Sequence, residues 1–531
     1  MIDTAAFQRL RRLEQTSYRV LYPSASHDRF THSLGVFHLG KLAYEAIVEN
    51  QKESDFELMD EMESKLKELK NPFLTACLLH DVGHAPFSHT CEDFFDDDKK
   101  TLRDKLIDIV RKRFVKEPQR FKDFEKDVKN RNFVAKPHEF MGAILLIDDM
   151  SLDVANFFNN NEEHLDFAAR AIIGCTYDVT GKNGSVRDDL DLKNALIRIL
   201  NSTLIDVDKL DYTVRDSITS GYSNVEMDLP RLMSSYTLAK NDKYNGRIWP
   251  AYKKSALSVI EHVFLARNNQ IRWIQSHNAV VYETELLQRS LMQIEKNVRG
   301  FKLNELFCFE SLREKGTNIR TPKRPIHLLA DEDILSLMKK YYNDVNISET
   351  EEYFNRGLRK RAIWKTHAEY NATFNGQVDE VYSAFARFLK LKQDAKFTRP
   401  VNKANFDSFF DLDENYLKDA YMEFFSKINY TLDDSNSELL FVSYNADKFS
   451  KKFNAEEIFL VYNGNCKSFY EVMKSASTSN DKNVEGISES RLPGKGFFVF
   501  YKRINDAKIS PNKFLDAYNQ CFSKERAKAP A

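Results

Sequence analysis

The chain has 531 residues, of which 42% are hydrophobic and 30% charged, a composition typical of a globular protein with about two to four domains. The formal net charge of −1 excludes an overall basic field that would draw the molecule to nucleic acid or to an anionic membrane. The six cysteines are scattered, the N-terminus lacks a signal pattern, and no apolar stretch approaches the ~20 residues that span a bilayer. We therefore expect a soluble, cytoplasmic protein.

The first part of the chain, up to about residue 330, has mostly helical patterns. Apolar residues at helical spacing predict a helix over 33–49, and Asn71 followed by Pro72 indicates the start of the next helix. Gly83 and Pro86 are expected to break the chain after it. Residues 97–132 carry many charges of both signs and predict a solvated helical insertion, with nucleic-acid binding as the less favoured alternative. Further helical patterns cover 138–158, 163–175, 191–203, 229–239 and 252–298.

Two polar segments separate these helices: a charged cluster, Asp206–Asp216, and a loop, Asp178–Asp189. After residue 330 the pattern changes, because strand-like runs rich in aromatic and β-branched residues follow three more helices. The helices are expected at 332–342, 377–392 and 414–427, the strands at Leu439–Tyr444, Ile458–Tyr462 and Phe497–Tyr501, a polar loop at Ser475–Pro493 and a disordered tail at Lys524–Ala531. We predict a mainly α fold, with a helical core over 1–330 and a smaller α+β region over 331–531 that serves regulation or oligomerisation.

The dipeptide His80-Asp81 is the strongest chemical signal, because it ends a solid apolar run and three histidines with an aspartate lie within ten residues. Such groups are destabilising when buried without partners, and a metal ion is a common partner. Adjacent helical residues point ~100° apart, so this pair can bracket one ion. His32 and one carboxylate of the segment 206–212 are candidates for the remaining ligands, and spacing alone leaves Asp206 and Asp208 open.

Three segments occur in a fixed order: Arg-Phe-x-His-Ser-Leu-Gly from residue 29, His-Asp-x-Gly-His-x-Pro-Phe-Ser-His from residue 80, and Asp-x-Asp-Lys-x-Asp-Tyr from residue 206. This combination resembles the HD-domain superfamily and, within it, the deoxynucleoside triphosphate triphosphohydrolases. The resemblance covers 5–90, 136–145, 203–222 and 263–280. It implies one divalent metal ion (Mn, Fe, Mg or Zn) on four ligands: His32, His80, Asp81 and Asp208.

The resemblance also implies a reaction, the hydrolysis of a deoxynucleoside triphosphate (dNTP) to a deoxynucleoside and inorganic triphosphate by attack of water on the α-phosphorus. His89 is the implied general acid, oriented by Glu92, and His84 and His138 line the pocket. The implied substrate-binding residues are Arg29, Lys209 and Arg267 at the phosphates, Tyr212, Asp216 and Gln15 at the deoxyribose, and His277. Base preference does not transfer, because Gln275 stands where some relatives have tyrosine.

Two other functions stay open: an HD-type nuclease or other phosphodiesterase, and a catalytically inactive nucleotide sensor. A cyclic-dinucleotide phosphodiesterase is disfavoured, because its His-His-Glu and Gly-Tyr-Pro signatures are absent from the sequence. The resemblance also implies a homo-oligomer. The basic cluster Arg356–Arg361 is a candidate binding site for an allosteric nucleotide, although a solvated helix face is the favoured interpretation. Control of dNTP pools and antiviral defence are both compatible with these residues.

Overall fold

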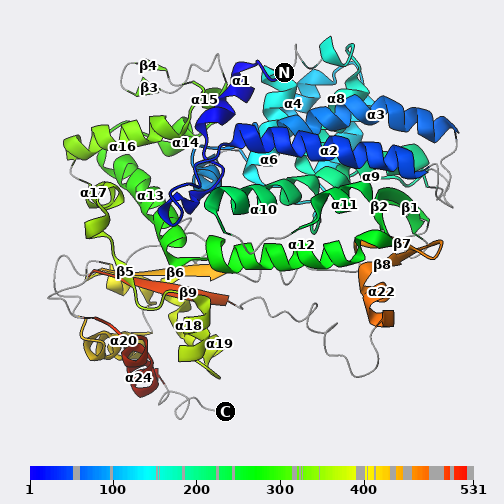
Figure 1. The fold of residues 1–531 in the computed structure, drawn as a ribbon. Coiled ribbons are helices and arrows are strands. Elements are labelled where there is room, and N and C mark those ends of the chain that lie inside the picture. The colour runs from blue at the N-terminus through cyan, green and yellow to red at the C-terminus, as the bar shows by residue number, and fades with distance from the viewer. Residues whose placement is uncertain are drawn as a thin grey trace. The chain divides into compact units, whose positions relative to one another are not determined.

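The computed structural model describes the chain from residue 1 to residue 522 apart from 52–59, 96–99, 151–153, 155, 182–185, 223–226, 242–245, 314–319, 322–323, 326, 346, 390–400, 404, 412–413, 431–437, 446–456, 477–494 and 503–507. The structure is mainly helical with small sheets, as predicted (Figure 1). It divides into two compact units: a first unit of Met1–Asn269, Gly300–Leu337 and Lys452–Ser490, and a second unit of Gln270–Arg299, Met338–Lys451 and Arg491–Ala531. No described helix has the length and apolarity needed to cross a membrane.

The centre of the first unit is a set of helices that bury their apolar faces against one another. Helix α2 (Arg29–Gln51) packs on α3 (Asp60–Leu79) and α10 (Val207–Ser220), and α3 also packs on α8 (Glu162–Ile173) and α9 (Asp188–Leu200). The charged segment 206–216, expected between two helices, is instead most of α10. Its helix begins because the Asp206 side chain caps the amide of Lys209, and it ends at Gly221, which adopts a left-handed conformation.

The remaining described helices of the first unit are α1 (Ala5–Gln8), η1 (Arg9–Arg12), η2 (Ser17–Val20), η3 (Ser88–Thr90), η4 (Glu92–Phe95), α4 (Leu102–Arg113), α5 (Pro118–Val128), α6 (Pro137–Ile144), η5 (Leu145–Asp149), α11 (Leu229–Ser234), η7 (Lys254–Ala256), α12 (Leu257–Gln270), α14 (Leu303–Leu306), α15 (Phe309–Leu312), α16 (Asp331–Val345) and α22 (Phe469–Ala476). Two of these, α12 and α16, cross the boundary between the units. Helices α4 and α5 confirm the helical structure predicted over 97–132, and its assignment as an insertion stays a prediction.

The helix start predicted at Asn71 and Pro72 is wrong, because α3 runs through both residues. An interior proline costs about 3 kcal/mol relative to alanine. The helix persists because burial outweighs this cost: Leu66 and Leu69 before the proline and Phe73 after it are buried at helical spacing. The predicted break after the helix is confirmed, since α3 ends at Leu79.

A four-stranded sheet of the first unit joins distant parts of the chain. Strands β1 (Tyr236–Asn241) and β2 (Arg247–Lys253) form an antiparallel pair, β7 (Phe459–Tyr462) runs parallel to β2, and β8 (Asn465–Ser468) completes the order β1-β2-β7-β8. The helix predicted over 229–239 is therefore wrong beyond α11. Side chains at the end of α2 hold β1 in place, because Asn50 donates to the carbonyl oxygen of Tyr236 and Gln51 to that of Leu238. Two short strands, β3 (Arg320–Thr321) and β4 (Arg324–Pro325), form a separate pair.

The second unit is built around an antiparallel sheet in the order β5 (Arg361–Ala362), β9 (Lys495–Tyr501) and β6 (Leu439–Asn445), and its core is rich in aromatic rings. The runs Leu439–Tyr444 and Phe497–Tyr501 are confirmed as strands, and Ile458–Tyr462 is confirmed as β7 of the first unit. Helices near 332–342 and 414–427 are also confirmed, whereas the one expected over 377–392 ends as α19 at Phe385. Most of Ser475–Pro493 and all of Lys524–Ala531 lie outside the described residues. The described elements of this unit are η8 (Ile271–Gln275), α13 (Asn278–Asn297), α17 (Ser348–Phe354), η9 (Arg356–Leu358), β5 (Arg361–Ala362), α18 (His367–Thr373), α19 (Val378–Phe385), η10 (Ala386–Phe388), η11 (Phe406–Phe409), α20 (Asn415–Lys427), β6 (Leu439–Asn445), β9 (Lys495–Tyr501) and α24 (Pro511–Phe522).

The units do not coincide with the division expected at residue 330. Residues 270–299 belong to the second unit because α13 packs on α17 and β6. Residues 452–490 belong to the first because β7 pairs with β2.

Candidate active site

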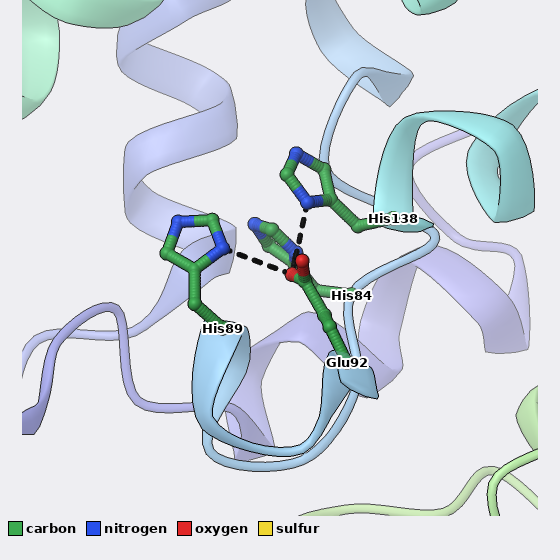
Figure 2. Close-up of side chains that lie close together, drawn as sticks. All are labelled: His84, His89, Glu92 and His138. Carbon is green, nitrogen blue, oxygen red and sulfur yellow. Dashed lines mark hydrogen bonds and ion pairs between the residues drawn. The ribbon is translucent and has the colours of Figure 1, made fainter. Parts of the chain in front are cut away.

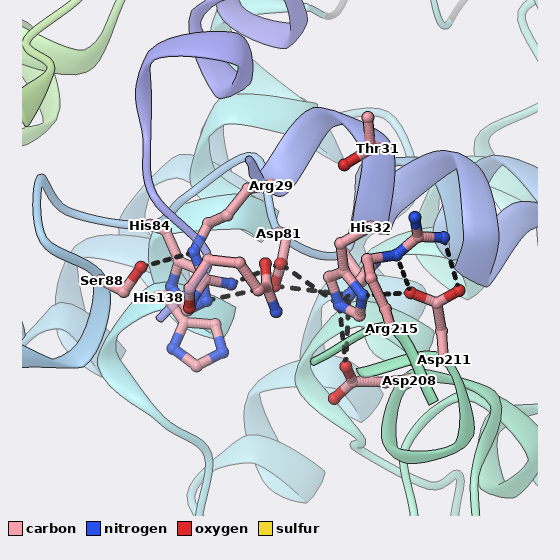
Figure 3. Close-up of polar contacts among 12 residues, drawn as sticks. Arg29, Thr31, His32, Asp81, His84, Ser88, His138, Asp208, Asp211 and Arg215 are labelled. Carbon is pink, nitrogen blue, oxygen red and sulfur yellow. Dashed lines mark hydrogen bonds and ion pairs between the residues drawn. The ribbon is translucent and has the colours of Figure 1, made fainter. Parts of the chain in front are cut away.

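Four side chains from three parts of the first unit meet in what we call the His–Asp cluster: His32 on α2, His80 and Asp81 after α3, and Asp208 on α10. Figure 3 labels three of them, His32, Asp81 and Asp208. The Nε2 atoms of the two histidines are 3.3 Å apart. His32 Nε2 lies 3.1 Å from Asp208 Oδ1 and 3.6 Å from Asp81 Oδ2. His80 Nε2 lies 3.3 Å from Asp81 Oδ1 and 3.7 Å from Asp208 Oδ1. His32, His80 and Asp81 each offer a donor atom within 4.8 Å of the other two, and Asp208 lies near the two histidines, so a metal ion with bonds of about 2.0–2.2 Å has its donor atoms close together here.

Both histidines are oriented by hydrogen bonds from their other ring nitrogen. His32 Nδ1 lies 2.7 Å from Asp211 Oδ2, and Arg215 donates to both oxygens of the same carboxylate, at 2.8 and 2.9 Å (Figure 3). His80 Nδ1 lies 3.0 Å from the carbonyl oxygen of Cys77. With Nδ1–H donating in each ring, the Nε2 lone pairs point into the cluster, as a metal ligand requires.

The electrostatics of the His–Asp cluster fit a divalent cation. Burial lowers the pKa of His32, but hydrogen bonds to Asp208 and Asp211 and the charge of Asp81 raise it to about 10. Negative charge is therefore concentrated here strongly enough to hold a proton on a fully buried imidazole. Burial raises the pKa of Asp81, and Arg29 with the neighbouring histidines lowers it well below its usual range. A bound metal cation would neutralise the negative charge of these side chains, which protons otherwise neutralise.

The structure places Asp208 and Asp206 in different environments. Asp208 faces the two histidines, whereas Asp206 is fully buried at the start of α10. Its carboxylate accepts hydrogen bonds from the amides of Lys209, at 2.7 Å, and Ser202, at 3.0 Å, and pairs with the Lys209 ammonium. Asp206 thus caps the helix that carries Asp208, and the choice of Asp208 as a metal ligand stays a prediction.

A second group, which we call the His–Glu cluster, consists of Glu92 and three histidines around one of its oxygens (Figure 2). Glu92 Oε1 lies 2.9 Å from His84 Nδ1, 3.0 Å from His89 Nδ1 and 2.9 Å from His138 Nδ1. Burial raises the pKa of Glu92, but His138 and the other histidines lower it well below its usual range, so the carboxylate is ionised. His89 is the exposed member, with 62% of its side chain accessible to solvent.

His84 connects the two clusters. Its Nε2 lies 3.2 Å from Asp81 Oδ1, and its ring centroid is 3.7 Å from that of His138. Burial, with Arg29 and His138, lowers the pKa of His84 well below the ordinary value, so this imidazole is neutral. The close approach requires a glycine at position 83, where a Cβ atom would lie 2.2 Å from the amide nitrogen of Gly142 and 2.3 Å from the carbonyl oxygen of His138.

The turn that carries His89 is strained, and a residue distant in the sequence, Asp331, holds it in place by hydrogen bonds. Phe87 and Ser88 both have φ near 54°, a left-handed conformation that is costly for these residues. Asp331 accepts hydrogen bonds from the amides of Phe87, at 2.7 Å, and Glu14, at 2.8 Å. Burial raises the pKa of Asp331 to about 7.

Three cations predicted to grip phosphates are engaged within the protein. Arg29 is buried and donates to Ser88 Oγ at 2.7 Å and to Asp81 Oδ2. Lys209 bonds to the carbonyl oxygen of Ser202 at 2.8 Å and to Asp206. Arg267 is buried, bonds to the carbonyl oxygen of Leu204 and reaches the hydroxyl of Tyr212 at 3.4 Å. The phosphate contacts of these three cations stay predictions. In the structure Arg29 orients Asp81, and Arg267 orients Tyr212.

The residues predicted to bind the deoxyribose lie on α10 and on the loop before α2. Tyr212 and Asp216 are four residues apart on α10. The side-chain oxygen Oε1 of Gln15 is buried and has no hydrogen-bond partner among the described residues. Asp216 is also buried, and its carboxylate lies 2.8 Å from His27 Nε2. Burial raises the pKa of Asp216, which the interaction with His27 opposes.

Two predicted features lie in the second unit. His277 precedes α13, where its Nδ1 accepts a hydrogen bond from the amide of Ala279 at 3.1 Å. In the basic cluster, Arg359 pairs with Glu283 at 2.6 Å and Lys360 with Glu352 at 3.0 Å. Ion pairing neutralises these two cations, and the allosteric nucleotide at Arg356–Arg361 stays a prediction.

Sequence reasoning missed two polar partners of the site, Asp211 and His27. Asp211 is part of the segment 206–212 and faces His32 because it lies three residues, nearly one helical turn, beyond Asp208. That spacing was a signal that could have identified it. His27 contacts a residue 189 positions away, so no local pattern indicated its partner.

Comparison with known proteins finds similarity over part of the chain. The chain is 26% identical over 300 residues to an HD-domain-containing protein of Acanthamoeba polyphaga mimivirus, a match that covers 55% of this chain and 53% of that protein. It is 31% identical over 237 residues to the deoxynucleoside triphosphate triphosphohydrolase SAMHD1 homolog of Dictyostelium discoideum, covering 44% of this chain and 35% of that protein. No protein-family model matches the chain.

The fold is similar to that of the phosphohydrolase BT4208 from Bacteroides thetaiotaomicron, with a TM-score of 0.52, 18% identity, and coverage of 95% of this chain and 94% of that one. These similarities give the chain an HD-domain-like fold that carries the His–Asp cluster. The chain spans about half the length of the mimivirus protein and about a third of the Dictyostelium protein.

Proposed function

We propose that this protein is a metal-dependent triphosphohydrolase that converts a dNTP to a deoxynucleoside and inorganic triphosphate. The supporting observation is that the His–Asp cluster lies directly beside the His–Glu cluster, with His84 in contact with both. A metal-ligand set and a candidate proton donor are thereby next to each other, as hydrolysis of a phosphoester needs. The partial similarity to the Dictyostelium triphosphohydrolase points to the same substrate class.

In this reaction the oxygen of water forms a bond to the α-phosphorus and the water gives up a proton, the bond between that phosphorus and the 5′ oxygen breaks, and the 5′ oxygen takes up a proton. His32, His80, Asp81 and Asp208 hold a divalent cation. When bound, the cation neutralises phosphate charge and lowers the pKa of water. His89 donates the proton to the leaving 5′ oxygen through Nε2, since Nδ1 is bonded to Glu92.

The deoxyribose is assigned to Gln15, Tyr212 and Asp216. The unpartnered Oε1 of Gln15 accepts a hydrogen bond from a sugar hydroxyl, which relieves the cost of a buried polar atom without a partner. The Tyr212 ring packs against the 2′ carbon and leaves no space for a ribose hydroxyl.

The proposal is tested by identifying the products formed from each of the four dNTPs with added Mn²⁺, Mg²⁺ or Fe²⁺. We expect deoxynucleoside and intact triphosphate in equal amounts. Release of diphosphate or single phosphates, or degradation of labelled single-stranded DNA or RNA in place of dNTPs, would assign a different reaction to the site.

Two isosteric variants separate ligand loss from helix loss. Asp208→Asn is expected to abolish turnover and to lower the metal content measured after gel filtration. Asp206→Asn keeps an effective helix cap, so it is expected to keep the bound metal. Equal metal content in the two variants would contradict the assignment of Asp208.

A further inference from the structure

His27 connects two parts of the chain that the proposed function assigns to the deoxyribose. Its backbone carbonyl oxygen accepts a hydrogen bond from the amide of Gln15 at 3.0 Å. Its side chain reaches α10, where the ring nitrogen Nε2 lies 2.8 Å from Asp216 Oδ1. Gln15 and Asp216 are far apart in the sequence, and His27 is in direct contact with both of them.

The contact between His27 and Gln15 fixes the backbone of the loop before α2. It is part of a short antiparallel pairing, since Glu14 and Asp28 form an isolated β-bridge. The position of Gln15 relative to His27 is therefore set by backbone hydrogen bonds. The Gln15 side chain carries the buried Oε1 atom that has no hydrogen-bond partner among the described residues.

The His27 ring is held at both nitrogens by residues of α10. Besides the contact with Asp216, Nδ1 lies 3.0 Å from the hydroxyl oxygen of Thr219. The side chains of His27 and Asp216 are only 6% and 2% exposed, so water competes little for their hydrogen bond. Burial raises the pKa of Asp216, and the contact with His27 opposes this rise. His27 therefore favours the ionised carboxylate, which is the stronger hydrogen-bond acceptor.

We infer that His27 is a positioning residue that makes the site select a sugar with a 3′ hydroxyl, because it holds Gln15 and Asp216 in fixed places around that group. This inference rests on the proposed function, since it names what sets the specificity of the same site. The 3′ hydroxyl is the only hydroxyl on the sugar of a dNTP, so it is the group that polar side chains at the deoxyribose can bind. His27 acts through Gln15 and Asp216 and does not itself contact the substrate.

Two variants separate the two side-chain contacts of the His27 ring. In His27→Gln the amide nitrogen reaches about as far as Nε2 and still donates to Asp216. In His27→Asn it reaches only about as far as Nδ1, so it keeps the contact with Thr219 and loses that with Asp216. His164→Asn is the matched control, because His164, on α8, also pairs with a carboxylate, that of Glu68 at 2.9 Å. Circular dichroism and Tm show whether each variant is folded.

The test compares a dNTP with its 2′,3′-dideoxy analogue, which lacks the 3′ hydroxyl. KM and kcat are measured for both nucleotides. Their dissociation constants are measured by calorimetry with Mg²⁺ present, with each His27 variant combined with Asp208→Asn so that turnover does not consume the nucleotide. The ratio of the two KM values, or of the two dissociation constants, measures how strongly the site selects the 3′ hydroxyl.

We expect this ratio to favour the dNTP by about tenfold to a hundredfold in the wild type, as for a hydrogen bond to a charged group. His27→Asn should lose most of the ratio through a higher KM for the dNTP, with little change in kcat or in the KM of the analogue. His27→Gln and His164→Asn should keep the ratio. A merely structural role of His27 would instead raise KM for both nucleotides alike. That result, or a ratio in His27→Asn within twofold of the wild type, would overturn the inference.

The binding measurement separates this inference from the proposed activity. If the wild type hydrolyses neither nucleotide, but the preference for the dNTP in binding is lost in His27→Asn and kept in His27→Gln, the role of His27 holds and the activity is wrong. If the wild type converts both nucleotides with equal KM, the activity holds and the inference is wrong. If the protein neither hydrolyses nor binds either nucleotide, both are wrong.

Discussion

Replacement of Asp211 by asparagine tests how the second layer of the His–Asp cluster supports metal binding. The Asp211 carboxylate is nearly buried, with 9% of its side chain exposed, and accepts the 2.7 Å hydrogen bond from His32. It thereby fixes the ring so that Nε2 faces the cluster, and its charge makes His32 a better donor. Asparagine keeps the shape and one acceptor but removes the charge.

Loss of an outer-layer partner of this kind typically weakens metal binding by about tenfold to a hundredfold. For Asp211→Asn we expect a loss of metal affinity at the lower end of this range, because the amide oxygen of asparagine still accepts a hydrogen bond from His32. This neutral hydrogen bond has about half the strength of the charge-assisted one that it replaces. We therefore expect an increase of about tenfold in the apparent dissociation constant of Mn²⁺, equivalent to about 1.4 kcal/mol. The α2–α10 packing should persist, since the substitution is isosteric.

The assay is a competition between the protein and a fluorescent chelator for Mn²⁺ at fixed pH, with circular dichroism to check the fold. Arg215→Gln is the matched control. It leaves the contact between Asp211 and His32 in place and removes a pair whose arginine is 27% exposed, so a loss below about fivefold is expected. The reasoning would be refuted if the Mn²⁺ dissociation constant of Asp211→Asn stayed within twofold of the wild type. It would also be refuted if Arg215→Gln lost more Mn²⁺ affinity than Asp211→Asn.

Two further changes probe the supports of the site. Gly35→Ala would place a Cβ atom 1.9 Å from Asp211 Oδ1, so we expect it to displace that carboxylate and weaken Mn²⁺ binding at least as much as Asp211→Asn in the same competition assay; unchanged affinity would contradict this. The pKa of Asp331 is about 7 in the folded protein, above its unfolded value of about 3.9, so the native state binds more protons between these values and the contribution of Asp331 to stability falls as pH rises through that window. The free energy of unfolding, measured with urea at pH 5, 6 and 7, should therefore depend less on pH in Asp331→Asn than in the wild type. Parallel curves of this free energy against pH would disprove the prediction.

The clearest successes of sequence reasoning follow from local chemistry. The histidines and aspartates of the three segments are polar groups at the ends or faces of apolar helices, and their need for partners predicted a shared site before any contact was known. The strands of the last hundred residues were predicted for a similar reason, since β-branched and aromatic residues in short runs favour a pleated, buried surface.

The failures came from tertiary packing that overrides local preference. Pro72 indicated a helix start, but buried neighbours on both sides keep α3 continuous. Residues 236–239 have a helical pattern, yet pairing with β2 and bonds from the end of α2 make them a strand.

What the sequence alone determined was the identity of the polar groups that must find partners, because residue type and helical spacing are local properties. Only the tertiary structure decided which partner each one has: Asp208 rather than Asp206 lies at the histidines, and Asp211 lies behind His32. The physical reason is that these contacts join residues far apart along the chain, and their distances depend on how the helices pack.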